Sequence, residues 1–288
     1  MRNFMLWLLA FVITISAAIF QRLTGPTYPI RGKVSLNNNI ISYKLSRSHG
    51  GDKDHILNID VSDKDIQGEV VYRRFKTNDE WTTIRMFHDE SGLVGYLPHQ
   101  PPAGKLEYLV YLMNKEDRIS LSGEQAVIIR FKGDVPAHVL IPHIIIMFAA
   151  MLLSTRTGME ALQRNNNPKT MALWTIVLLF VGGIILGPLV QQYAFGAFWT
   201  GFPLGDDLTD NKTLIAFFGW LFAFFISQRK INGNWWIVAA SLILLIVFLI
   251  PHSLMGSELD YSEVEEAWIK LPLFLSAILP PLSWRHPV

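Results

Sequence analysis

The chain has 288 residues, of which 50% are apolar and only 17% are charged, and its formal net charge is +1. This composition is unusual for a soluble globular protein, and the balanced charge gives no basis for nucleic acid as a partner. Cysteine is absent, which excludes disulfides, thiolate metal sites, iron–sulfur clusters and covalent attachment of haem to this chain. The composition thus predicts an integral membrane protein, and the lipid bilayer is its first predicted partner.

The first predicted element covers residues 1–22, where an apolar run follows Arg2. Two interpretations are open. The run is a signal peptide with a small-residue cleavage site near residues 16–18, or it is an uncleaved transmembrane anchor. We favour the anchor because the run is nearly long enough to cross a bilayer. Both interpretations put the next segment outside the cytoplasm.

Residues 27–133 have the pattern of an all-β domain. Short runs of alternating apolar and polar residues recur here and are separated by turn residues, which favours antiparallel strands. We predict nine strands, at residues 31–36, 40–46, 55–61, 69–75, 82–88, 93–97, 106–113, 118–121 and 126–132. Strands of this length and spacing predict an antiparallel sandwich, which both interpretations of the first segment place outside the cytoplasm. The stretch 96–111 resembles the late strands of immunoglobulin-like or fibronectin-type modules, a resemblance that implies a fold only.

Apolar runs dominate the chain from residue 138 on. Each is close to the length that crosses the hydrocarbon core of a bilayer, and we predict helices at residues 138–154, 171–190, 213–227, 235–251 and 267–283. The expected fold class is an α-helical membrane protein of about six transmembrane helices with an inserted immunoglobulin-like sandwich. The expected domains are an anchor at 1–22, the sandwich at 27–133 and a five-helix transmembrane bundle at 138–284.

Loop charges predict the orientation of this bundle. Basic residues gather at the two chain ends and in two loops, at Arg2, Arg156, Arg164, Lys169, Arg229, Lys230 and Arg285. Acidic residues dominate the opposite loops, around residues 206–210 and 258–266. By the positive-inside rule, both termini then lie in the cytoplasm and the β domain lies outside. We expect a multi-pass protein of a bacterial-type inner membrane.

Three histidines fall at the outer ends of predicted spans. His138 and His143 open the second span, and His252 closes the fifth. Histidine at membrane depth is a good ligand for haem, copper or zinc. A spacing of five residues separates helical side chains by about 140°, so His138 and His143 do not share a face. The alternative is interfacial histidines bonded to the backbone, because polar residues near helix ends cost little.

The outer loop at residues 187–213 is rich in aromatic residues and glycine and then becomes acidic. Trp199 is a candidate platform for a planar ligand, or else a member of an aromatic belt at the membrane surface. The acidic end, around Asp206, Asp207, Asp210 and Asn211, could ligate a hard cation. Capping of the next helix by Thr209 or Asp210 is the alternative.

Part of this region carries a family resemblance. The runs Ala194-Phe-Gly-Ala-Phe-Trp199 and Leu214-Ile-Ala-Phe-Phe-Gly-Trp220 are followed by a basic turn and then by Ile250-Pro-His252. This order resembles the haem-handling membrane proteins of cytochrome c assembly, over residues 138–260. In that family the loop has several tryptophans and a Trp-Asp-Pro core, whereas this chain has Trp199 followed by Thr-Gly-Phe-Pro.

The resemblance implies that haem is held at the outer face by His143 and His252, with His138 as a substitute, against Trp199. The same two histidines, His143 and His252, are the candidate metal ligands. The implied partner is a respiratory or cytochrome-assembly membrane protein. The leading functional prediction is therefore binding or handling of a haem or metal cofactor at the outer membrane face.

Two other classes of function stay open. The first is a non-enzymatic docking or assembly protein that binds a partner through its β domain and predicts an exposed apolar patch there. The second is a transporter, although ionisable residues are almost absent from the predicted mid-membrane segments. Nothing predicts an enzyme, since a nucleophile with its base, a phosphate loop and a zinc-protease motif are all missing from the sequence. The loop at residues 47–55, with His49 and His55, predicts a solvated turn or a metal site.

Overall fold

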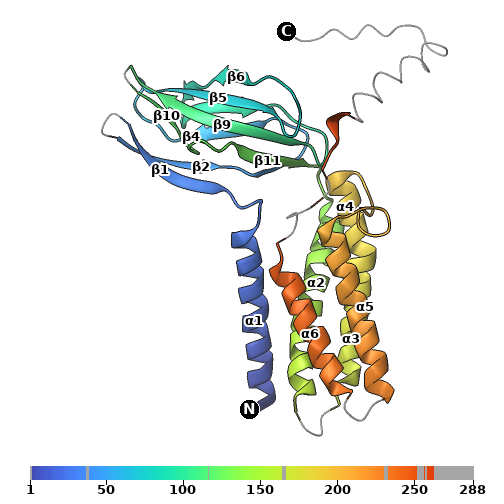
Figure 1. Ribbon diagram of the computed structural model, residues 1–288. Coiled ribbons are helices and arrows are strands. Elements are labelled where there is room, and N and C mark those ends of the chain that lie inside the picture. Colours follow the sequence, from blue (N-terminus) through green and yellow to red (C-terminus); the bar gives the residue numbers. More distant parts are fainter. Residues whose placement is uncertain are drawn as a thin grey trace, which may run out of the picture.

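The computed structural model describes residues 2–36, 39–115, 117–163, 167–229, 233–251, 256 and 258–262. In this part of the chain a strand-rich domain sits over one end of a group of roughly parallel helices (Figure 1). All the described strands lie between Ile30 and Lys132, after the first helix and before the second.

The helices follow the apolar runs of the sequence. They are α1 (Arg2–Thr24), α2 (Ala137–Ala161), α3 (Lys169–Leu179), the π-helical η1 (Phe180–Leu186), α4 (Gly187–Phe195), α5 (Leu208–Arg229) and α6 (Asn234–Leu249). Because α3, η1 and α4 are continuous, the chain has five helical segments within the described residues. Three stretches are long and apolar enough to span a membrane, namely Asn3–Thr24, Ala137–Ala161 and Lys169–Phe195.

The expected fold class, a helical membrane protein of six spans, is wrong. The described residues combine five helical segments with eleven strands in three sheets, and only three of the helical segments qualify as spans. α5 begins at Leu208 rather than at residue 213. Its first turns therefore contain Asp210 and Lys212, which lower the mean hydropathy of the helix. α6 is apolar but has only 16 residues. The predicted helix at 267–283 lies outside the described residues.

The strands are β1 (Ile30–Leu36), β2 (Asn39–Leu45), β3 (Ser48–Gly50), β4 (His55–Ile59), β5 (Gln67–Arg74), β6 (Thr82–Arg85), β7 (Phe87–Asp89), β8 (Gly92–Leu97), β9 (Lys105–Met113), β10 (Arg118–Ser120) and β11 (Val127–Lys132). All nine predicted strands are confirmed, the one at 82–88 as the pair β6 and β7. Met86 separates that pair, and its backbone N–H donates to the Gly68 carbonyl at 2.8 Å. The short β3 is an additional strand that the alternation of residues does not predict.

Three sheets form from these strands. One is the hairpin β1–β2, one has the order β4-β8-β7, and the largest has the order β3-β11-β9-β5-β6, with β10 also paired to β9. The described pairs are antiparallel except for β3 with β11, which is parallel. Alternate residues of β9, including Tyr108, Val110 and Leu112, are fully buried, as a half-buried strand requires. They belong to one core that the strands of all three sheets share.

Several contacts join the strand domain to the helices. The backbone N–H of Gly133, directly after β11, donates to the Ala194 carbonyl in α4 at 3.0 Å. Beyond α6, the Glu258 carboxylate bridges Lys76 and Lys105 at 2.6 and 2.5 Å. Burial raises the pKa of the Glu258 carboxyl, but hydrogen bonds from the two lysines outweigh it and hold that pKa below its usual value. These contacts hold the strand domain against the end of α4 and against Glu258 in the chain beyond α6.

Small residues allow the helices to pack closely, as is common in membrane bundles. A Cβ atom on Gly158 of α2 would lie 2.5 Å from Oγ of Ser241 in α6, and one on Gly182 of η1 would lie 2.8 Å from Sδ of Met147 in α2. The Ser241 hydroxyl donates to the Ser154 carbonyl at 2.9 Å across the same interface. Since α2 packs on α1, α3, η1, α4 and α6, it is the central helix of the group.

We predict that Gly158→Ala destabilises the helical bundle, because the added methyl group overpacks the contact with Ser241. Overpacking of a tight site costs about 1–3 kcal/mol. The matched control is Gly219→Ala in α5, where a Cβ atom meets no atom within 4 Å. Thermal unfolding in detergent should show a lower Tm for Gly158→Ala than for Gly219→Ala. Equal melting temperatures would contradict the close approach of α2 and α6.

Candidate functional site

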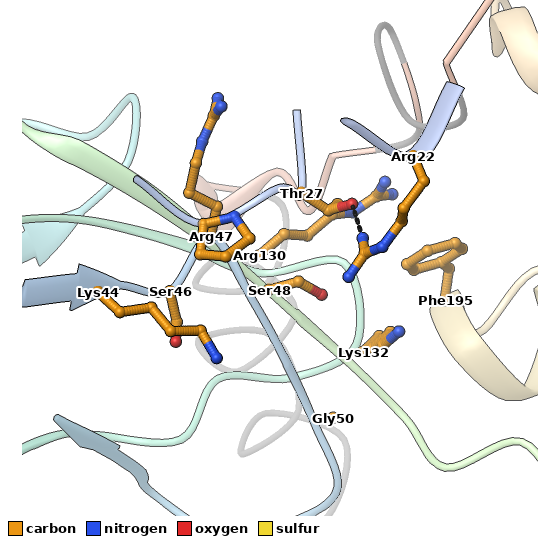
Figure 2. A pocket seen from close by; sticks show the side chains of 11 residues that line it. Arg22, Thr27, Lys44, Ser46, Arg47, Ser48, Gly50, Arg130, Lys132 and Phe195 are labelled. Carbon is orange, nitrogen blue, oxygen red and sulfur yellow. Dashed lines mark hydrogen bonds between the residues drawn. The ribbon is translucent and has the colours of Figure 1, made fainter. Parts of the chain in front are cut away.

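A cavity of about 480 Å³ lies where the end of α1, the strand domain and the end of α4 meet (Figure 2). We call it the junction pocket. It is lined by Arg22, Thr27, Pro29, Lys44, Ser46, Arg47, Ser48, Gly50, Arg130, Lys132 and Phe195. Five of these side chains are cationic and none is acidic. The lining therefore favours an anionic ligand.

The strand β3 brings the basic residues together. Its parallel pairing with β11 aligns Ser48 with Arg130 and Gly50 with Lys132. The backbone N–H of Arg130 also donates to the Arg47 carbonyl at 3.2 Å. Just before β3, the buried Tyr108 hydroxyl of β9 donates to the Ser46 carbonyl at 2.8 Å. The chain on either side of Arg47 is thus held against β11, and Arg47 and Arg130 line one cavity.

Arg130 is the buried cation of the pocket, with only 6% of its surface exposed. Its guanidinium carbon lies 3.9 Å from the centroid of the Phe195 ring, a cation–π contact between β11 and α4. Burial lowers the pKa of Arg130 to about 10, although Asp207 and Glu258 act in the opposite direction. The side chain stays charged at neutral pH, so a desolvated positive charge lines the pocket.

The other four cations surround Arg130. Arg22, Lys44 and Lys132 are exposed to solvent, and Arg47 is half-buried. Arg22 comes from the last turn of α1, and its Nη1 donates to the Thr27 hydroxyl at 3.4 Å, as Figure 2 shows. Carboxylates lie close by but outside the lining, among them Asp134 near Gly50 and the two that act on Arg130.

None of these basic residues was a predicted site residue. They are spread from residue 22 to residue 132, and each one alone has the pattern of an ordinary surface charge. The only sequence signal is their position at the ends of predicted elements, as with Arg22 after the first apolar run and Lys132 at the end of the last strand. That signal is weak, because the pocket residues can be identified from it only when it is known which strand ends lie next to each other.

The predicted haem and metal residues are placed as follows. His138 is exposed in the first turn of α2, and His143 is half-buried one and a half turns further on. The indole N–H of Trp199 donates to the Phe202 carbonyl within its own loop at 3.0 Å. His252 lies outside the described residues. The structure therefore does not test whether His143 and His252 approach each other near Trp199.

His143 has one feature of a metal ligand. Its Nδ1 lies 2.9 Å from the Gly182 carbonyl of η1, and donation there fixes the tautomer that leaves the Nε2 lone pair for another partner. No three histidine, aspartate or glutamate side chains among the described residues come together to hold a metal ion. His138, His143 and Trp199 do not line the junction pocket. The haem prediction also names His252, which lies outside the described residues, and so it stays a prediction.

The acidic end of the loop before α5 stabilises the backbone of the loop itself. A carboxylate oxygen of Asp210 accepts from the backbone N–H groups of Thr200 and Gly201 at 2.7 and 3.0 Å. Asp207 accepts from the backbone N–H of Thr209 at 2.7 Å and so caps the first turn of α5. The predicted cap at Thr209 or Asp210 is thus wrong by two or three residues, because α5 begins earlier than expected.

A second titratable cluster lies in the strand domain. The Nδ1 atoms of His49 and His55 are 3.1 Å apart, and Nε2 of His49 lies 2.9 Å from the Lys53 carbonyl. His55 is 9% exposed. Burial, and then the nearby His49, lower the pKa of His55 to about 4. The predicted turn at 47–55 is therefore partly a strand with a buried, neutral histidine.

The docking alternative expects an apolar patch on the strand domain. Ile56 on β4, Phe87 on β7 and Tyr96 on β8 are 58%, 50% and 39% exposed. Ile56 is opposite Tyr96 in the sheet register, and the rings of Phe87 and Tyr96 stack with centroids 6.0 Å apart. These three side chains form a small exposed apolar face of the sheet β4-β8-β7. Docking through this face stays a prediction.

We predict that His55 makes the stability of the strand domain dependent on pH. Its pKa falls from 6.5 to about 4 on folding, so the unfolded chain binds more protons between these values. Stability is then lost as pH falls from 6.5 toward 4. His55→Phe should flatten the dependence of Tm on pH in this window, whereas His138→Asn, which removes an exposed histidine, should leave it unchanged. Identical slopes for the two variants would contradict the burial of a neutral His55.

No protein-family model, no curated protein and no solved structure matches the chain. The junction pocket, the histidines and the apolar face are thus the observations that bear on function.

Proposed function

We propose that this protein is a membrane-anchored binding protein whose junction pocket takes up an anionic group, phosphate or carboxylate, at the membrane surface. The observation that carries the proposal is the convergence of five cationic side chains on one cavity that no acidic side chain lines. They come from α1, β2, β11 and the segment between β2 and β3. Charge of one sign inside a concave surface raises the local concentration of the opposite ion.

Arg130 supports this proposal more strongly than the exposed cations do. Its low exposure means that it has already given up most of its hydration before a ligand arrives. Charge-assisted hydrogen bonds between a guanidinium group and an oxyanion are about twice as strong as neutral ones. A cation held in a partly desolvated position also attracts an anion more strongly than one in bulk water. We therefore assign anion binding to Arg130 and Arg47, with Arg22, Lys44 and Lys132 as attracting charges.

We also propose the orientation of the protein. Basic residues lie at the end of the helices away from the strand domain, as with Arg156 in α2, Lys169 at the start of α3 and Arg229 at the end of α5. The positive-inside rule assigns that end to the cytoplasm. The strand domain and the junction pocket then lie on the extracytoplasmic side of a bacterial-type inner membrane.

We predict that Arg47→Gln weakens the binding of inorganic phosphate to the full-length protein in detergent by about tenfold, because one charge-assisted hydrogen bond is lost. The control is Arg85→Gln on β6, which removes an exposed charge that does not line the pocket. The rise in Tm with added phosphate reports the affinity of each variant, since a ligand of the folded state stabilises it by mass action. If wild type, Arg47→Gln and Arg85→Gln responded alike, the pocket would not be the anion site.

The orientation is tested by cysteine labelling, which suits this chain because it has no cysteine of its own. Thr83→Cys puts a thiol on an exposed position of β6, and Asn167→Cys puts one at an exposed position before α3. We expect a membrane-impermeant maleimide to label Thr83→Cys in spheroplasts and to label Asn167→Cys only after permeabilisation. The opposite pattern would reverse the proposed orientation.

A further inference from the structure

The level of the junction pocket relative to the membrane points to its ligand. Arg22 lies in the last turn of the candidate span Asn3–Thr24, and Phe195 is the last residue of the candidate span Lys169–Phe195. Two spans therefore end at the pocket, at the depth where hydrocarbon gives way to headgroups. Basic side chains at the end of a span extend into that layer. The pocket is thus at headgroup level.

Exposed apolar side chains lie on α1 within two turns of the pocket residue Arg22. Ile19, Phe20 and Leu23, in the two turns of α1 that end at the pocket, are 54%, 51% and 52% exposed. The cavity, of about 480 Å³, is in the size range of sites that hold whole small molecules rather than single ions. A ligand with an anionic head and apolar chains matches both surfaces. The head would occupy the pocket while the chains lie along α1.

We infer that the ligand of the junction pocket is the phosphate-bearing headgroup of an anionic phospholipid from the leaflet on this side of the membrane. The inference rests on the proposed function and names its ligand. The positive charge of the lining favours anionic over zwitterionic lipids. The five cations attract the phosphate of every phospholipid, but they repel the quaternary ammonium group of a zwitterionic choline lipid. A phosphatidylglycerol headgroup carries the same phosphate without that opposing charge.

The test measures which lipid the full-length protein retains. The purified protein is incubated in detergent with equal amounts of phosphatidylglycerol and phosphatidylcholine and repurified, and the bound lipid is quantified by mass spectrometry. We expect retention of phosphatidylglycerol over phosphatidylcholine by roughly tenfold. The double variant Lys44→Gln/Arg47→Gln should lose this preference. Its matched control, Lys33→Gln/Arg85→Gln, removes two exposed charges that do not line the pocket and should keep it.

The same samples distinguish the lipid inference from the proposed function of anion binding. Inorganic phosphate is titrated into each variant in parallel, and a thermal melt verifies that each variant is folded. Equal retention of the two lipids, together with phosphate binding that depends on Arg47, would overturn the lipid inference and leave a soluble anion as the ligand. Equal retention without any phosphate binding would overturn both the inference and the proposed function. If Lys44→Gln/Arg47→Gln keeps the preference of the wild type, the lipid binds elsewhere and the inference is overturned.

Discussion

The parallel pairing of β3 with β11 is the interaction on which the junction pocket depends. It joins the chain that follows β2 to the last strand before α2, so residues about eighty positions apart in sequence share one cavity. Arg130 is buried between two neighbours. The ring of Phe195 covers one face of its guanidinium group, and the segment that leads into β3 is hydrogen-bonded to its backbone. Without this pairing, nothing would hold the Arg47 segment beside Arg130, and the two side chains would not line one cavity.

The connections between the strand domain and the helices set the depth of that cavity. Gly133 bonds to Ala194 at the end of α4, and the bridge from Glu258 to Lys76 and Lys105 holds the chain beyond α6 against the strands. Gln21 of α1 donates to the Phe248 carbonyl at 2.6 Å, which ties the end of α1 to α6. The pocket is therefore held at the ends of the candidate spans, and this position supports a ligand that belongs to the membrane surface.

Local pattern explains why the strands were predictable and the fold class was not. Alternation of apolar and polar residues is a period of two that a strand such as β9 carries in its own sequence. The three residues of β3 are too few to show such a period. The span count depended on the bounds of the helices. α6 has only 16 residues, and the polar first turns of α5 belong to its helix because Asp207 caps it at a point that the apolar run does not mark. The haem prediction came from a resemblance, and its ligand His252 lies outside the described residues.

Composition and periodicity by themselves determined that this chain has apolar helices able to cross a membrane and a strand-rich segment between the first two, because both properties are written in consecutive residues. Only the tertiary structure decided which strand ends meet, which arginine is buried and where the cavity lies. Those depend on contacts between residues far apart in the chain, and a charge on a strand end looks the same in the sequence whether it faces solvent or a pocket. Arg85 and Arg130 both lie in predicted strands. Arg85 is exposed to solvent, whereas Arg130 is buried against the ring of Phe195, with 6% of its surface exposed.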